Sequence, residues 1–152
     1  MDVELPEYLP LEEAARRYRL SQEMLARAVE DGRIRAVRVN GRILVAGEDI
    51  RQISENRAKS EEIWEQVKHL DGIPIGISEA SSKYGVDSTS IYGWINRGYV
   101  RLIEDRRGGG RGRKRLVNEA DIAYAALVAK HRGRRQGKPI LTRSLAPPWS
   151  RQ

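Results

Sequence analysis

The chain has no cysteine and no phenylalanine among its 152 residues, whereas glycine occurs 14 times. The absence of cysteine excludes disulfides and thiolate metal sites, and it fits a reducing compartment. The lack of phenylalanine together with frequent glycine predicts small hydrophobic cores. No apolar run approaches the length of a membrane-spanning helix and the first residues are acidic, so neither a membrane span nor a signal peptide is predicted. We therefore expect a soluble, cytoplasmic protein.

Patterns of catalysis and metal binding are also lacking. The two histidines, His69 and His131, lie far apart and have no partner at metal-ligand spacing. The glycine run 108–110 is followed neither by a helix nor by Gly-Lys-Ser/Thr, so it does not match a phosphate-binding loop. Acidic pairs such as Glu12-Glu13 lie at expected helix starts, where negative charge favours the helix. We expect no enzymatic activity, no cofactor and no metal.

Positive charge is concentrated in the second half of the chain. The 28 Lys or Arg and 21 Asp or Glu leave a net charge of +7. Residues 1–70 carry 12 basic and 14 acidic residues, a net −2, and residues 71–152 carry 16 and 7, a net +9. A basic half suits a polyanion, of which nucleic acid is the commonest in a cytoplasm. The alternative is a solvated surface that only maintains solubility.

Residues 77–117 predict two short helices followed by a β-hairpin. The first helix ends at Gly85, and the second begins after Asp87, a suitable N-cap, and ends at Gly98. Apolar spacing assigns a small core to Ala80, Tyr84, Val86, Ile91, Trp94 and Ile95. The residues expected to face outward, of types that reach phosphates and base edges, are Ser88, Thr89, Ser90, Tyr92, Asn96 and Arg97.

The predicted hairpin has a long basic tip. Its basic residues are Arg101, Arg106, Arg107, Arg111, Arg113, Lys114 and Arg115. Residues 110–114, Gly-Arg-Gly-Arg-Lys, resemble the Arg-Gly-Arg core of AT-hook peptides, with Lys114 where a proline usually follows. That resemblance implies arginines lying along a narrow A·T minor groove. Arg132-Gly133-Arg134, followed by Arg135, repeats the pattern, and a plain solvated charge run is the alternative for both segments.

An earlier stretch repeats this organisation. At one constant offset, without gaps, Glu13, Ala14, Tyr18, Leu25 and Gly32 align with Glu79, Ala80, Tyr84, Ile91 and Gly98, which indicates an internal duplication. The first hairpin, 37–45, contains Asn40-Gly41, a strong signal for a type I′ turn. An Asp-Ile pair follows each hairpin, at 49–50 and 121–122. The offset between these pairs is larger than that between the helices, so the second hairpin is the longer one.

The first repeat is a weaker candidate for reading bases. Its second helix presents Gln22 and Arg27, but also Glu23 and Glu30, which repel phosphate. Its hairpin region is basic, with Arg33, Arg35, Arg38 and Arg42. This repeat therefore either grips DNA through the hairpin or uses its helix for protein contact.

The remaining segments connect and extend these repeats. Residues 48–72 predict a connecting helix, continuous or with one break, with apolar ends that pack on the two domains and an exposed polar middle from 54 to 62. Residues 131–152 lack apolar periodicity and predict a basic, flexible tail that ends near Pro147-Pro148-Trp149.

The run Ser-Thr-x-Ile-Tyr-x-Trp-Ile-x-x-Gly at 88–98, followed by a strand and a basic wing, resembles the winged helix-turn-helix of the excisionase and MerR type. The resemblance implies a mainly α fold with small β-hairpin wings (α+β), in which winged domains at 1–47 and 73–130 are joined by a long helix. It further implies a nucleoid-associated prokaryotic protein that binds double-stranded DNA sequence-specifically, with transcriptional regulation as the leading role.

Several other roles stay open at this stage. The second wing also resembles the winged helix of phage terminase small subunits, and excisionases that bend DNA share the general fold, so an architectural role in a mobile element is one alternative. A protein-interaction adaptor, docking a partner through repeat one or the C-terminal tail, is another, and a basic RNA-associated protein is a third. The sequence leaves the oligomeric state open.

Overall fold

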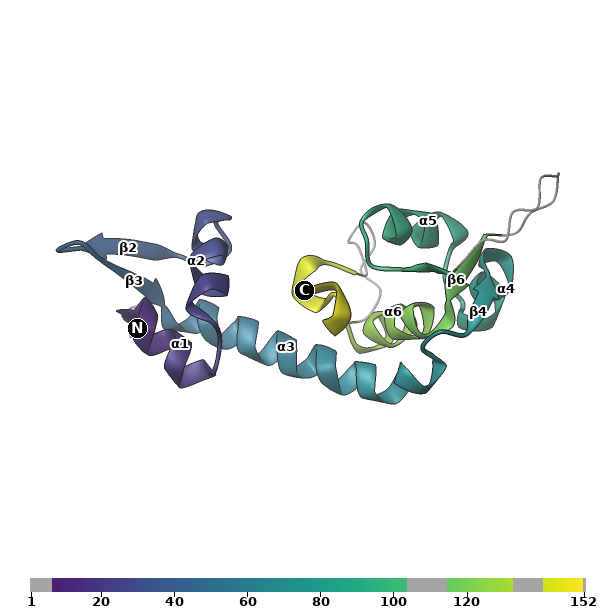
Figure 1. Ribbon diagram of the computed structural model, residues 1–152, viewed down its shortest axis with the longest axis horizontal. Coiled ribbons are helices and arrows are strands. Elements are labelled where there is room, and N and C mark those ends of the chain that lie inside the picture. Colours follow the sequence, from purple (N-terminus) through teal and green to yellow (C-terminus); the bar gives the residue numbers. More distant parts are fainter. Residues whose placement is uncertain (1–6, 104–114, 133–140, 152) are drawn as a thin grey trace, which may run out of the picture. The chain divides into compact units, whose positions relative to one another are not determined.

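The computed structural model describes residues 7–103, 115–132 and 141–151 (Figure 1). It is mostly helical and contains two three-stranded antiparallel sheets, which confirms the α+β class. The chain divides into two compact units, of which the first ends at Asn56 and the second begins at Arg57. Each unit has its own hydrophobic core. None of the helices in the described ranges is long and apolar enough to cross a membrane.

The first unit builds two helices and a sheet ahead of a long helix. Its elements are β1 (Tyr8–Pro10), α1 (Leu11–Tyr18), α2 (Gln22–Glu30), β2 (Ala36–Val39), β3 (Arg42–Ala46) and the first half of α3 (Gly47–Val67). The strand order is β1-β3-β2, and Leu9 and Ala36 both lie opposite Val45. Strand β1 was not predicted from the sequence, because it forms only by pairing with the distant β3.

Local signals explain the turns of this unit. Arg19 ends α1 in the left-handed conformation, and Ser21 then caps α2, its side chain accepting a hydrogen bond from the Met24 backbone N–H at 3.0 Å. Asn40 and Gly41 both have positive φ, at 51° and 77°, which a type I′ turn requires. The two helices and the hairpin follow from short-range interactions.

The second unit contains the same arrangement with additional segments. It comprises the second half of α3, η1 (Lys68–Leu70), β4 (Pro74–Gly76), α4 (Ile77–Tyr84), α5 (Ser88–Asn96), β5 (Leu102–Ile103), β6 (Leu116–Asn118), α6 (Glu119–Arg132), η2 (Arg143–Leu145) and η3 (Pro148–Arg151). The strand order is β4-β6-β5. Trp94, Ile91, Ile122 and Tyr124 are fully buried in its core. Strand β4, like β1, was not predicted.

The bounds of the elements follow the offsets of the sequence repeat. Strand β4 corresponds to β1, α4 to α1 and α5 to α2. In each pair, the first and last residues are separated by the same offset as the aligned residues of the sequence repeat. Helix α6 begins at the larger offset from α3 that the two Asp-Ile pairs share. Backbone bonds repeat as well: Leu20 N–H donates to Ala15 O at 2.9 Å, and Val86 N–H to Ser81 O at 3.2 Å. The two units can therefore be compared position by position.

Helix α3 contributes to both cores, but its middle is not wholly exposed. Ile50 and Ile53 pack in the first core, and Ile63, Trp64 and Val67 in the second, as predicted. The prediction of an exposed stretch from 54 to 62 is wrong for Ser60, which is fully buried. Its hydroxyl donates to Ala146 O at 2.9 Å, so a segment distant in sequence covers it.

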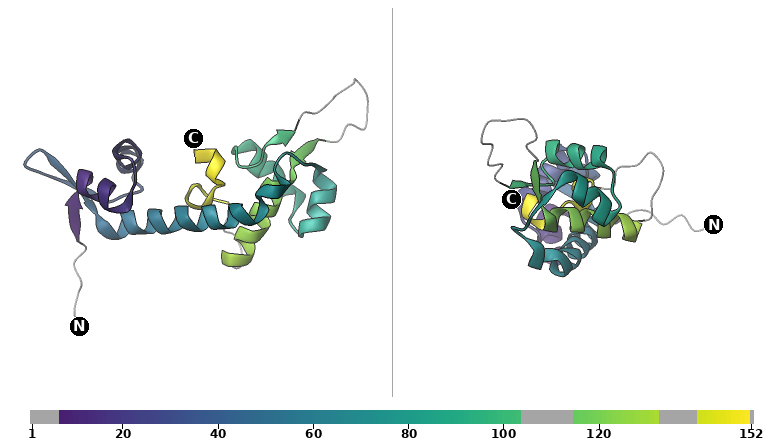
Figure 2. Two further views of the ribbon diagram at one scale, coloured as in Figure 1. Left: turned by 60° about the horizontal axis from the view of Figure 1, so that its bottom comes forward. Right: turned by 90° about the vertical axis from the view of Figure 1, so that its right-hand side faces the viewer.

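The predicted flexible tail is also corrected for residues 141–151. Leu141, Leu145 and Ala146 are buried, and the Tyr124 hydroxyl donates to Leu145 O at 2.7 Å. Figure 2 shows this last segment in yellow beside α3 and α6. Because these residues form short 3-10 turns rather than a helix, their apolar side chains have no periodicity to detect. Residues 133–140 lie outside the described part of the chain.

Candidate nucleic-acid interface

Helix α5 presents a polar face to solvent. Ile91 and Trp94, 0% and 1% exposed, anchor its opposite side in the core. Of the predicted outward residues, Ser90 is half-buried and the exposed ones are Ser88, Thr89, Tyr92, Asn96 and Arg97. The predicted division between core and solvent-facing residues therefore agrees with the burial pattern except at Ser90.

The side chains of this face have few partners within the protein. Arg97 Nε donates to Gly93 O at 3.3 Å, and its guanidinium lies 5.9 Å from the centroid of the Tyr99 ring. Among the described residues, the side chains of Ser88, Thr89 and Asn96 and the Tyr92 hydroxyl make no hydrogen bond or ion pair. Their donors and acceptors are available to a ligand.

The equivalent face of α2 carries a different charge. At the offset of the repeat, Glu23 replaces Thr89, Glu30 replaces Asn96, and Asp31 replaces Arg97. Gln22 and Arg27 are exposed there, but Arg27 Nη2 lies 3.7 Å from Glu23 Oε1. The α2 face is thus acidic where the α5 face is neutral or basic, so only the α5 face suits a polyanion.

The hairpin of the first unit adds exposed cations. Arg38 and Arg42 are exposed on β2 and β3, beside Val37 and Val39, which are 44% and 47% exposed. Arg33, which precedes the hairpin, pairs with Asp31 at 3.4 Å. This hairpin can contact phosphates through Arg38 and Arg42.

Only some of the predicted basic contacts of the second unit are described. Arg115 is exposed immediately before β6, and Arg132 is exposed at the end of α6 with its Nη1 3.5 Å from Thr142 Oγ1. The remaining predicted contacts lie outside the described residues; they are Arg106, Arg107, Arg111, Arg113, Lys114, Arg134 and Arg135.

Two arginines predicted to bind DNA are held by carboxylates instead. Arg101 donates from its backbone N and Nε to Asp121 Oδ2, at 2.9 and 3.1 Å, and from Nη2 to Oδ1 at 3.0 Å. Arg35 makes the same three bonds to Asp49, at 2.8, 3.1 and 3.2 Å. We call each set an Arg–Asp clamp. Because each guanidinium fork is occupied, Arg35 and Arg101 no longer belong to the candidate DNA surface, a correction that counting charges could not supply.

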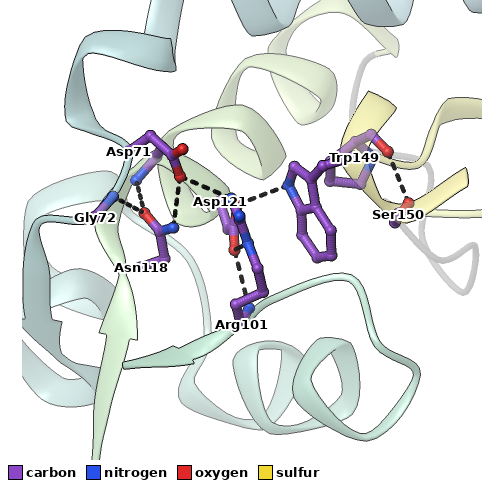
Figure 3. Close-up of polar contacts among 9 residues, drawn as sticks. Asp71, Gly72, Arg101, Asn118, Asp121, Trp149 and Ser150 are labelled. Atoms are coloured by element: carbon purple, nitrogen blue, oxygen red, sulfur yellow. Dashed lines mark hydrogen bonds and ion pairs between the residues drawn. The ribbon is translucent and has the colours of Figure 1, made fainter. Parts of the chain in front are cut away.

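The clamp of the second unit is part of a larger cluster (Figure 3). Arg101 Nη2 also donates to Asp71 Oδ1 at 2.8 Å, and Asn118 Nδ2 donates to the same oxygen at 2.7 Å. Trp149 Nε1–H donates to Asp121 Oδ1 at 3.0 Å. These bonds join the residue before β5 to the start of α6 and to the C-terminal segment.

Electrostatics differ between the two clamps. Burial raises the pKa of the fully enclosed Asp121, although the bonds from Arg101 act in the opposite direction. Hydrogen bonding from Arg35 lowers the pKa of Asp49, which lies nearer the surface. The two clamps therefore share one geometry and differ in how much water reaches the carboxylate.

The chain matches no protein-family model, no curated protein and no solved structure. In the parts of the chain that the structure describes, no three His, Asp or Glu side chains gather into a group that could hold a metal ion. Function is therefore inferred from the surfaces of the two units.

Proposed function

We propose that this protein binds double-stranded DNA in a sequence-dependent manner through two winged helix-turn-helix domains, and that it acts as a transcriptional regulator. The observation that carries the proposal is the polar face of α5, which is exposed and has free donors and acceptors. Helix α5 has nine residues and is thus about 13 Å long, a size that suits the major groove. It also belongs to the basic half of the chain, which carries +9 from residue 71 onward.

The side chains of this face suit distinct parts of the duplex. Ser88 and Thr89 lie in the first turn of α5, the part of a recognition helix that reaches base edges. Asn96 and Arg97 lie at its other end, where phosphate contacts are more common. Tyr92, 45% exposed between them, offers both an aromatic ring and a hydroxyl. We therefore assign base reading to the first turn and backbone contacts to the last.

The first unit has a narrower role in this proposal. The acidic residues of α2 make its exposed face unsuitable for reading bases, whereas Arg38 and Arg42 extend along the hairpin. We assign phosphate contacts through the hairpin to this unit. Such contacts add affinity and set orientation without specifying sequence.

A comparison of nucleic acids tests the proposal. The full chain is titrated with duplex DNA, duplex RNA and single-stranded DNA of matched sequence at several salt concentrations. We expect the tightest binding to duplex DNA, with log Kobs falling linearly with log salt, and the enrichment of particular sites from a random duplex pool. Equal binding to all three, or preference for either of the other two, would rule out a duplex-DNA reader.

A further inference from the structure

Arg19 and Gly85 occupy the same position in the two units and adopt the same left-handed backbone conformation. Their φ and ψ angles are 54° and 44° for Arg19, and 64° and 34° for Gly85. Each residue ends the first helix of its unit. Glycine is the common residue in such a cap because it has no Cβ, whereas an arginine there costs free energy.

The interior of the protein does not explain why an arginine stands at this position. Arg19 is exposed, and its guanidinium makes no hydrogen bond or ion pair with any other described residue. A Cβ built on Gly85, at the equivalent position of the second unit, would meet no atom within 4 Å. Lack of space therefore does not explain the choice of residue there. A strained residue without internal partners indicates that its side chain acts on something outside the chain.

The surroundings of Arg19 indicate the charge of that partner. Arg16, in the last turn of α1, is also exposed and pairs with no described carboxylate, so two cations flank the turn that leads into α2. The neighbouring Arg17, in contrast, pairs with Glu13 at 3.1 Å. Of the acidic residues of α2, Glu23 lies in the first turn and pairs with Arg27 at 3.7 Å. Glu30 and Asp31 lie about 12 Å along the axis from that turn.

We propose that Arg19, with Arg16 beside it, binds a backbone phosphate of duplex DNA. The first unit then contacts DNA through the turn between α1 and α2 as well as through its hairpin, and Glu30 and Asp31 at the far end of α2 stay away from the duplex. A guanidinium suits this role because its fork can donate two hydrogen bonds to one phosphate. The inference rests on the proposed function and adds a contact in the unit that does not read bases.

The variant Arg19→Gly separates the contact from the fold. It removes the guanidinium and introduces glycine, the residue found at the equivalent position 85 of the second unit. The Tm should therefore be unchanged or higher. Affinity for short duplex DNA of random sequence should fall about three- to tenfold near 0.1 M salt, and the slope of log Kobs against log salt should decrease by about 0.9. Arg19→Lys should retain most of the affinity.

A charge-matched control is available in the same unit. Arg51 is exposed on α3 and lies 3.9 Å from Glu55, and Arg51→Ala removes one positive charge without touching the turn. We expect it to leave the salt slope unchanged. An equal loss of affinity in Arg51→Ala and Arg19→Gly would mean that the effect comes from net charge alone, and it would overturn the phosphate contact.

The other outcomes distinguish the two proposals. If the wild type binds duplex DNA and Arg19→Gly keeps the same slope of log Kobs against log salt, the phosphate contact is overturned and the proposed function stands. A wild-type chain that binds no duplex DNA overturns the proposed function itself. A fall in Tm for Arg19→Gly contradicts the strain argument, and Arg19→Asn, which tolerates the left-handed conformation, then tests the charge alone; unchanged binding in that variant overturns the contact.

Discussion

The Trp149 ring lies over Arg101, with its centroid 4.0 Å from the guanidinium carbon. In the described part of the first unit, no aromatic ring covers Arg35, the residue in the equivalent position. The Asp121 side chain is 0% exposed and that of Asp49 is 21% exposed. The C-terminal segment thus converts one of two equal clamps into an enclosed one.

Loss of the Trp149 ring should destabilise the second unit. Trp149→Ala removes the cation–π contact, the indole hydrogen bond and apolar packing, and we expect it to lower the free energy of unfolding by about 2–4 kcal/mol. Trp149→Phe keeps a ring over Arg101 but not the N–H, and should cost about 1 kcal/mol. Urea unfolding measures both, and a Trp149→Ala variant as stable as the wild type would show that the segment is not docked.

The two clamps provide a matched pair for the effect of burial. Arg101→Ala leaves the Asp121 carboxylate buried without its cation and should cost about 3 kcal/mol. Arg35→Ala leaves a carboxylate that water can reach, so its effect should be smaller. Denaturant unfolding of the two variants checks the order. The reverse order would mean that burial of the carboxylate does not determine the cost.

Acid should weaken the first unit through Asp49. Because hydrogen bonding from Arg35 lowers the pKa of Asp49 in the folded state, the folded protein favours the ionised carboxylate. Its contribution is complete above the unfolded pKa of about 3.9 and is lost as pH falls through the lower folded value. Asp49→Asn should therefore show a shallower decline of Tm below about pH 4 than the wild type. An equal decline in Asp49→Asn and in the wild type would contradict this contribution.

Two glycines should respond oppositely to alanine. Gly85 has φ +64°, so Gly85→Ala should lower stability by about 1 kcal/mol. Gly93 lies inside α5, where an added Cβ would meet Arg97 Nη2 at 3.4 Å, the mobile end of a long side chain. Gly93→Ala should raise stability by about 0.5–1 kcal/mol, because alanine favours a helix interior. Thermal unfolding decides, and a stabilised Gly85→Ala would contradict the left-handed assignment.

Sequence discrimination should depend on the first turn of α5. Replacing both Ser88 and Thr89 by alanine should relax the choice among DNA sites, since each lost base contact costs about 1–3 kcal/mol of discrimination. Gln22→Ala, at the position equivalent to Ser88, should have less effect. Competition between selected and random duplexes measures the change. A shift in preference only for Gln22→Ala would transfer base reading to the first unit.

The features that the sequence predicts correctly depend on short-range interactions. The bounds of α4, the start of α5 after Asp87 and the Asn40-Gly41 turn each involve residues close to one another in the chain. The exposed face of α5 belongs to the same class, because helical periodicity separates Ile91 and Trp94 from their polar neighbours. The order of residues along the chain is sufficient for such features.

The features that only the tertiary structure decided join residues far apart in the sequence. Strand β4 exists because β6 lies beside it, and the Ser60 hydroxyl reaches the distant Ala146. Arg101 counts as a basic residue in the sequence, yet the fold brings Asp121, Asp71 and Trp149 around it. Whether a polar group faces a partner or water depends on which distant segments pack against it. Periodicity and composition carry no record of those contacts.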